Sequence, residues 1–286
     1  MISKIIDVII IGAGPAGIAC AIQLKRYNID SIVFEKDEIG GLLKNANLVE
    51  NYPGFPNGIS GNKFVELLKK QTQNNKLNIK LETVENVKWA KDTFNVKTNI
   101  NVYHSKYLVI ASGTKPIVPK VPVICDDVKN TVFFEIYKLG QIKNKDIAII
   151  GAGDCAFDYA LNLCVNNKVI ILNRGNQIKA LPILQDRALK VATIKYFDNT
   201  VVQEIGTIDK QLKLILKNTD ESILVDYLII AIERKPNLDF IDTNLLINPY
   251  VFQVGDVKNG QYRQTAIAVG DGTFTAMNIY SILNNK

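Results

Sequence analysis

Two glycine-rich segments carry the residue types that bind phosphate. The first, GAGPAG at residues 12–17, directly follows a short β-branched run at residues 7–11. Gly12 permits a tight turn, Gly14 lets a pyrophosphate approach the backbone, and Gly17 allows a helix to pack closely on a strand. Phosphate would then lie at a helix N-terminus, where free N–H groups and the helix dipole favour negative charge.

An acidic residue strengthens this interpretation. The strand-like run SIVFE at residues 31–35 ends in Glu35, about twenty residues after the glycine segment, where a carboxylate accepts hydrogen bonds from an adenosine ribose. Because strand, glycine loop, helix, strand and acid follow in that order, we favour a dinucleotide site over a glycine turn beside a surface Glu.

The second segment, GAGDCA at residues 151–156, repeats the pattern after the run at residues 146–150. The strand-like run that follows, at residues 168–172, ends without an acid and is succeeded by Arg174 and Lys179. A cation there suits a 2′-phosphate, which favours NADPH over NADH, although an arginine at a strand end is also often a solvated surface charge.

The order of the remaining elements indicates one domain inserted in another. A proline-rich linker covers residues 116–122, and the run YVFQVGD at residues 250–256 suits the first domain better than the second. We therefore predict an α/β chain with two Rossmann-like, three-layer (ββα) dinucleotide-binding domains. The FAD-binding domain would comprise residues 1–115 and 242–286, and the NAD(P)H-binding domain would comprise residues 118–240.

Composition excludes several other classes. The 286 residues contain no apolar run long enough to span a bilayer and no arginine-rich block, so we expect a soluble cytoplasmic protein that binds neither membrane nor nucleic acid. The net charge of +6 suits an acidic redox partner such as a ferredoxin or flavodoxin, although the charges are also interspersed along the chain. A single histidine, His104, and scattered cysteines predict no metal site.

Several ordered motifs resemble the low-molecular-weight thioredoxin reductase family, a branch of the pyridine nucleotide-disulfide oxidoreductases. GGLL at residues 40–43 and ENYPGFP at 50–56 are similar to its flavin-binding segment, and ASGT at 111–114 to its domain-crossing turn. AIERKPN at 231–237 is similar to the end of its NADPH domain, and GD at 255–256 with YRQTA at 262–266 to its second FAD motif.

The resemblance implies non-covalent FAD, NADPH or NADH as the electron donor, a homodimer, and hydride transfer from nicotinamide to flavin. The residues that would hold FAD are Gly12, Gly14, Pro15, Ala16, Glu35, Gly41, Leu42, Asn51, Gly113, Asp256, Arg263, Gln264 and Thr265. Those that would hold NAD(P)H are Gly151, Gly153, Asp154, Arg174 and Lys179. The family's paired arginines are incomplete, because Gly175 follows Arg174.

The family's redox-active C-x-x-C is missing. Its place before the second glycine motif holds FEIY at residues 134–137, so the thiol relay of the family cannot operate there. Thioredoxin-reductase-like ferredoxin (flavodoxin)–NADP reductases also lack the dithiol, and GDCAFDYA at residues 153–160 is similar to their corresponding helix. Phe134 and Tyr137 would either cover the flavin face or pack in the core.

Three hypotheses follow. The favoured one is an FAD-dependent NAD(P)H oxidoreductase, of the ferredoxin-NADP reductase type, that passes electrons to a redox protein or a small acceptor. The second is a thioredoxin or disulfide reductase-like enzyme that uses other thiols or another electron donor. The third is a flavin-binding sensor whose catalytic relay has decayed.

Overall fold

A computed structural model describes residues 4–119, 130–217 and 221–284. The chain forms two compact units. Unit 1 comprises the residues up to 44, residues 49–115 and the residues from 235 onward, and unit 2 comprises residues 45–48 and 116–234. The main segment of unit 2 therefore interrupts unit 1 in the sequence.

A seven-stranded sheet lies at the centre of unit 1, with strand order β3-β2-β1-β6-β5-β4 and with β17 also paired to β6. The strands β3, β2, β1, β6 and β17 are parallel, whereas β4, β5 and β6 form an antiparallel meander. Their bounds are β1 (Ile5–Ile11), β2 (Ser31–Glu35), β3 (Ile79–Leu81), β4 (Val84–Ala90), β5 (Thr93–Thr98), β6 (Val102–Ile110) and β17 (Val251–Gln253).

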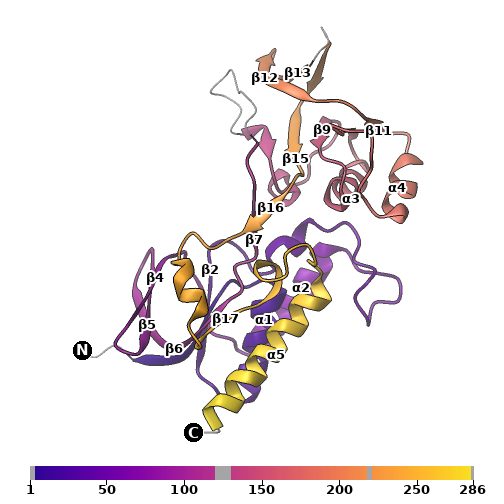
Figure 1. The fold of residues 1–286 in the computed structure, drawn as a ribbon. Coiled ribbons are helices and arrows are strands. Elements are labelled where there is room, and N and C mark those ends of the chain that lie inside the picture. The colour runs from indigo at the N-terminus through magenta and orange to yellow at the C-terminus, as the bar shows by residue number, and fades with distance from the viewer. Residues whose placement is uncertain (1–3, 120–129, 218–220, 285–286) are drawn as a thin grey trace. The chain divides into compact units, whose positions relative to one another are not determined.

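The two faces of β1 pack against different layers. Val8 and Ile10 join a core cluster with residues of helices α1 (Pro15–Arg26) and α5 (Thr265–Asn284), which lie alongside each other in Figure 1. Ile9 and Ile11 face a second cluster with Phe94 of β5. Burial on both faces explains why β1 is a continuous apolar run. Helix α2 (Gly61–Asn74) begins after the N-cap Ser60.

Unit 2 repeats this architecture around a parallel sheet with strand order β11-β10-β9-β15-β8. One core cluster joins this sheet to α3 (Asp154–Leu163) and α4 (Pro182–Leu189), and another joins it to a three-stranded antiparallel sheet. The parallel sheet contains β8 (Val132–Phe133), β9 (Asp146–Ile150), β10 (Lys168–Leu172), β11 (Ile194–Phe197) and β15 (Tyr227–Ile230). The antiparallel sheet contains β12 (Val202–Ile208), β13 (Gln211–Leu216) and β14 (Ser222–Val225). The predicted α/β class with two Rossmann-like domains is confirmed.

The chain leaves and re-enters unit 1 through β7 (Thr114–Pro116) and β16 (Arg234–Pro236), which pair with each other. Unit 1 resumes at residue 235, and the N–H of Asn237 donates to Gly113 O at 3.1 Å. Short 3-10 helices complete the fold: η1 (Gly41–Asn45), η3 (Ile136–Leu139), η4 (Thr243–Ile247) and η5 (Gly255–Val257).

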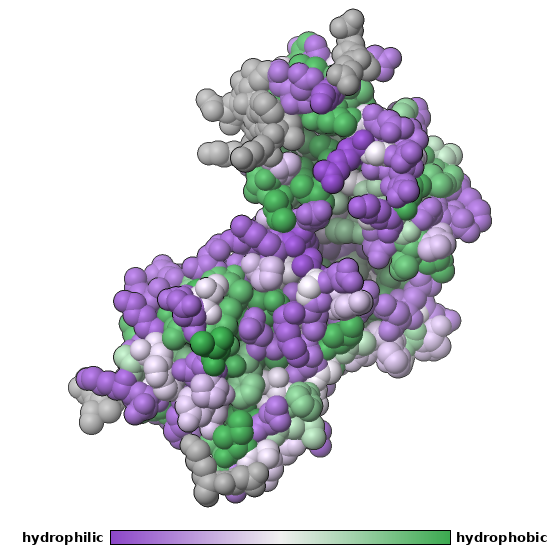
Figure 2. Space-filling view, in the orientation of Figure 1, coloured by the Kyte–Doolittle hydropathy of each residue, from purple (hydrophilic) through white to green (hydrophobic). Residues whose placement is uncertain are grey.

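Within the described ranges, no helix is long and apolar enough to cross a membrane. On the face that Figure 2 shows, hydrophilic and hydrophobic residues are interspersed. The exposed hydrophobic residues include Phe274, Met277 and Tyr280 of α5.

Helices α1 and α5 approach so closely that one position between them admits only glycine. A Cβ atom at Gly272 would lie 2.1 Å from the carbonyl oxygen of Ala16 and 3.0 Å from the nitrogen of Cys20. Two residues earlier on the same helix, a Cβ at Gly270 would meet nothing within 4 Å. The two glycines of α5 therefore differ in what surrounds them.

We predict that Gly272→Ala destabilises the protein by about 1–3 kcal/mol, because the added methyl group forces two backbones apart. The matched change Gly270→Ala should instead stabilise α5 by about 0.5–1 kcal/mol, since alanine favours the helix and has room there. Thermal unfolding followed by circular dichroism measures both. Equal melting temperatures for the two variants would contradict the close α1–α5 contact.

Candidate functional site

The first glycine segment forms a tight loop between β1 and α1. Gly12 has φ +110°, and a Cβ there would lie 2.3 Å from Ala111 O, while a Cβ at Gly17 would lie 1.9 Å from Gly12 O. Gly14 has nothing within 4 Å of its Cβ position and is the N-cap of α1, with no side chain capping the helix. Packing therefore requires Gly12 and Gly17, whereas Gly14 leaves open space at a helix N-terminus, as a bound pyrophosphate requires.

Glu35 ends β2 beside this loop. Its Oε2 accepts the N–H of Ala13 at 2.8 Å, and its Oε1 accepts the N–H of Asp37 at 3.0 Å. An ionised carboxylate has about four acceptor positions, so these two bonds orient the group and leave capacity for a ribose diol. The loop and the acid thus have the relation that the sequence predicts.

A hollow in unit 1 adjoins both features. Gly12, Phe34 and Glu35 line one side. Its other lining residues include several that sequence analysis missed, namely Glu82, Thr83, Val84, Ser112, Asn237 and Phe240. Residues 82–84 could have been predicted from their position directly after β3, because parallel sheets bind ligands at the carboxyl ends of their strands.

The flavin-binding segment returns to the same loop. The N–H of Gly40 donates to Ala13 O at 2.9 Å, and a Cβ at Gly41 would lie 3.3 Å from the Cα of Gly14. Leu42 follows in η1. Gly113 has φ +64° in the crossing segment, where its carbonyl accepts the N–H of Asn237.

The C-terminal motif also reaches this loop. A Cβ at Gly255 would lie 2.9 Å from that of Ala16, which places Asp256 in η5 near the start of α1. Arg263 and Gln264 directly precede α5, which begins at Thr265, and the amide of Asn51 donates to Gln264 Oε1 at 2.9 Å. The residues predicted to hold FAD therefore gather from distant parts of unit 1.

Asp271 of α5 fixes the turn that carries Asp256, and sequence analysis missed it. Its Oδ2 accepts the N–H of Gly255 at 3.0 Å and the amide of Asn259 at 2.6 Å. Lys258 lies 3.4 Å from its other carboxylate oxygen. Nothing in the local sequence distinguishes Asp271 from a surface acid of a helix.

The second glycine segment has the same construction. Gly151 has φ +141°, and a Cβ there would lie 2.2 Å from Ala231 O. Gly153 is the N-cap of α3, again with no side-chain cap and nothing within 4 Å of its Cβ position. Asp154 begins α3, but its Oδ1 accepts the N–H of Leu181 at 2.7 Å and so orders the loop after β10.

That loop carries the predicted cations. Arg174 and Lys179 are both exposed, and the N–H of Lys179 donates to Ala152 O at 2.8 Å, which holds the loop on the glycine segment. The buried Asn173 organises the turn, because its amide donates to Gln177 O at 3.0 Å and to the Tyr196 hydroxyl at 2.9 Å. Asn173 was not predicted to have a role.

The segment at residues 134–137 surrounds a buried charge. Phe134 packs against a core cluster of unit 2, and the N–H of Tyr137 donates to Asn45 Oδ1 at 3.1 Å. Between them Glu135 is buried and accepts hydrogen bonds from Arg234 at 2.7 Å and from the Asn45 amide at 2.6 Å. Glu135 was not predicted to have a role. The feature of the sequence that could have indicated one is a charged residue within an apolar run.

None of the three described cysteines forms a disulfide. Burial raises the pKa of the Cys20 thiol to about 12. Cys155 is an exposed residue, but desolvation of its thiol raises the pKa to about 11, and desolvation also raises the pKa of Cys164. These groups are protonated at neutral pH and are therefore weak nucleophiles. Cys125 lies outside the described residues. In the described ranges, no three His, Cys, Asp or Glu side chains form a group suited to a metal ion.

Comparison with known proteins agrees with this geometry. A family model described as pyridine nucleotide-disulphide oxidoreductase matches residues 6–272. The thioredoxin reductase of Rickettsia conorii is 31% identical over 310 residues, which cover 97% of this chain and 98% of that protein. The 34.2 kDa protein in the rubredoxin operon of Clostridium pasteurianum is 25% identical over 307 residues, which cover 99% of each.

Solved structures show the same fold. The crystal structure of Lactococcus lactis thioredoxin reductase has a TM-score of 0.87 at 26% identity and covers 98% of this chain and 100% of that one. Two dinucleotide-binding loops on two Rossmann-like units define a flavoprotein oxidoreductase of thioredoxin reductase-like fold. The chain belongs to the pyridine nucleotide-disulphide oxidoreductase family, whose thioredoxin reductase-like members use FAD and NADPH.

Asp158, a second acidic residue of α3, has an unusually high pKa. Asp158 accepts the N–H of Asn47 at 2.9 Å, and burial raises its pKa to about 6. Because this value exceeds the ordinary 3.8, the native protein binds a proton between about pH 4 and pH 6 that the unfolded chain does not bind. The ionised carboxylate therefore lowers stability above pH 6, and this penalty fades as the pH falls towards 4.

We predict that Asp158→Asn is more stable than the wild type by about 2–3 kcal/mol at pH 8, and that the difference approaches zero near pH 4. Urea unfolding across this pH range measures it. Asp154→Asn, on the exposed side of the same helix, is the control and should show no such pH-dependent gain. A constant difference between wild type and Asp158→Asn at all pH values would refute the assignment.

Proposed function

We propose that the protein passes electrons from NAD(P)H through FAD to a small redox protein or a diffusible acceptor, without a dithiol relay. FAD would accept hydride from the nicotinamide, and the protein would supply binding and orientation. The observation that carries the proposal is the segment at residues 134–137, where the sequence has no cysteine and the structure holds the buried Glu135–Arg234 ion pair.

The first site fits FAD. The open space at Gly14 and the uncapped N-terminus of α1 suit a pyrophosphate, and the Glu35 carboxylate suits the adenosine ribose. On the resemblance of the motifs, Asp256 would bind the ribityl chain, and the main chain near Gln264 would contact the flavin ring. The sequence left Phe134 and Tyr137 either on the flavin face or in the core, and the packing of Phe134 against the core cluster of unit 2 supports the core for that residue.

The second site fits NAD(P)H. Gly151 and Gly153 shape the loop at α3, and the exposed Arg174 and Lys179 supply positive charge beside it. We favour NADPH, because a guanidinium binds a phosphate through charge-assisted hydrogen bonds.

Arg174→Ala should therefore raise KM for NADPH about tenfold and leave KM for NADH nearly unchanged, since a charge-assisted bond to the 2′-phosphate is lost. Steady-state reduction of an artificial acceptor with each nucleotide measures the two values. Lys168→Ala removes an exposed cation at the opposite end of β10 and serves as the control. An equal rise for both nucleotides would show that Arg174 does not recognise the 2′-phosphate.

Disulfide reduction remains a second candidate, because several relatives bear the name thioredoxin reductase. It would require other thiols near the flavin. The raised pKa values of Cys20, Cys155 and Cys164 disfavour it, since a thiolate is the reactive form.

Anaerobic titration tests the main proposal. We expect NADPH, and more weakly NADH, to bleach the flavin absorbance promptly, because the second site delivers the nucleotide that reduces FAD. Replacing each of the four cysteines by Ser should leave both bleaching and acceptor reduction unchanged. Failure of both nucleotides to bleach the flavin would refute the proposal, and loss of acceptor turnover in a cysteine variant would favour disulfide reduction.

We also infer the setting in which the enzyme works. Its net charge of +6 favours an acidic redox protein such as a ferredoxin or flavodoxin as the acceptor. A cytoplasmic homodimer is the state that the resemblance implies, and the exposed Phe274, Met277 and Tyr280 of α5 offer an apolar surface for a second copy. Sedimentation analysis distinguishes a monomer from a dimer.

A further inference from the structure

The turn at residues 82–84 forms one wall of the hollow beside Gly12 and Glu35. Backbone and side-chain bonds tie this turn to the one between β5 and β6. The N–H of Thr83 donates to Asn99 Oδ1 at 2.9 Å, and the N–H of Asn99 donates to Thr83 O at 2.9 Å. The wall is therefore held by residues that do not themselves line the hollow.

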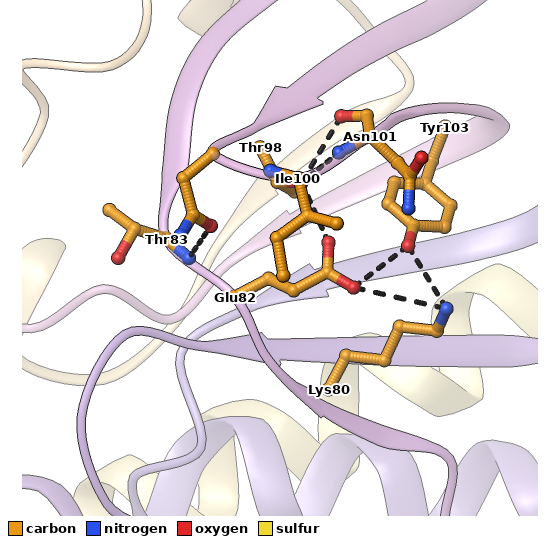
Figure 3. Close-up of polar contacts among 8 residues, drawn as sticks. Lys80, Glu82, Thr83, Thr98, Ile100, Asn101 and Tyr103 are labelled. Atoms are coloured by element: carbon orange, nitrogen blue, oxygen red, sulfur yellow. Dashed lines mark hydrogen bonds and ion pairs between the residues drawn. The ribbon is translucent and has the colours of Figure 1, made fainter.

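The Glu82 carboxylate is the centre of this attachment (Figure 3). It is 8% exposed, its Oε2 accepts the Thr98 hydroxyl at 2.6 Å, and its Oε1 accepts the Tyr103 hydroxyl at 2.8 Å. The ammonium of Lys80 lies 3.9 Å from Oε1 and balances its charge. Each carboxylate oxygen thus already has a strong donor from another strand.

Tyr103 connects two parts of the hollow without lining it. Its ring lies 4.8 Å from that of Phe34, which lines the side formed by β2, and its hydroxyl binds Glu82 on the opposite wall. Lys80 donates to the same hydroxyl at 3.0 Å. Tyr103 therefore contacts a residue on each side of the hollow, in addition to the pairing of β2 with β3.

We propose that Glu82 is a positioning residue that pre-organises this hollow for the adenosine end of FAD. The inference rests on the proposed FAD site, because the hollow adjoins the phosphate loop at Gly12 and the ribose acceptor Glu35. A wall fixed before binding needs no ordering when the nucleotide enters, and such pre-organisation increases affinity. Both oxygens of Glu82 bond to side chains of β5 and β6, so the carboxylate anchors the wall at Thr83 and Val84, and the variants below separate this role from direct contact with the nucleotide.

The experiment uses the full-length apoprotein and calorimetric titration with ADP, which carries the adenosine and pyrophosphate alone. Tyr103→Phe removes one hydroxyl donor to Glu82, and Thr98→Val removes the other together with the acceptor of the Ile100 and Asn101 N–H groups. Both changes nearly preserve shape. Each should raise the Kd of ADP about five- to tenfold, because a loosened wall must be ordered when the nucleotide binds. Thr98→Ser keeps the hydroxyl and should retain wild-type affinity.

Thr72→Val is the matched control, because Thr72 is also buried in unit 1 but its hydroxyl donates to Lys69 O on α2. It should leave the Kd of ADP unchanged, and NADPH binding at the second site should be unchanged in all variants. The double variant Thr98→Val with Tyr103→Phe should raise the Kd of ADP by less than the product of the two single increases, since both changes act through Glu82.

Other outcomes would overturn the inference. If Glu82→Gln weakens ADP binding but Thr98→Val and Tyr103→Phe do not, Glu82 contacts the nucleotide directly and does not act by positioning. If all these variants bind ADP like the wild type, the wall does not depend on Glu82. If the wild-type apoprotein binds neither ADP nor FAD, the proposed FAD site itself is wrong, and the inference is wrong with it.

Discussion

A carbonyl oxygen fills the space where the first glycine of each nucleotide loop would otherwise carry a side chain. In unit 1 the oxygen belongs to Ala111, 2.3 Å from a Cβ at Gly12, and in unit 2 it belongs to Ala231, 2.2 Å from a Cβ at Gly151. Both glycines also have positive φ, so two independent constraints exclude other residues. Each loop is thereby fixed against the segment in which the chain crosses between its two units, and the remaining site residues are arranged around that contact.

The features that could be predicted from sequence are those whose physical cause is local. The glycine loops, Glu35 at a strand end and the apolar runs of β1 and β9 each depend on a few consecutive residues, and their pattern indicates the fold. Glu82, Asp271 and Asn173 could not be predicted, because their roles depend on partners elsewhere in the folded chain.

The buried Glu135 shows how the segment at residues 134–137 accommodates a charge in physical terms. Removing two charges from water costs about as much as their attraction returns, so an ion pair such as Glu135–Arg234 adds little net stability. Its bonds to Asn45 and to Tyr159 instead fix the geometry of η3 and of the segment at residues 45–48. A polar network thus holds the segment at residues 134–137 in place.

The insertion of unit 2 has a consequence for the order in which the chain folds during synthesis. The layers of unit 1 require Val254, Ala276 and Ile279, which leave the ribosome last, whereas the final strand of the unit 2 sheet ends at Ile230. The ends of unit 2 also meet, because the N–H of Ile117 donates to Glu233 O at 3.0 Å. Domains generally fold as units, so unit 2 completes its core first. Until α5 is made, the face of β1 and β6 that packs on both α1 and α5 lacks one of its two helices, and in the growing chain the uncovered part is the surface that a chaperone would bind.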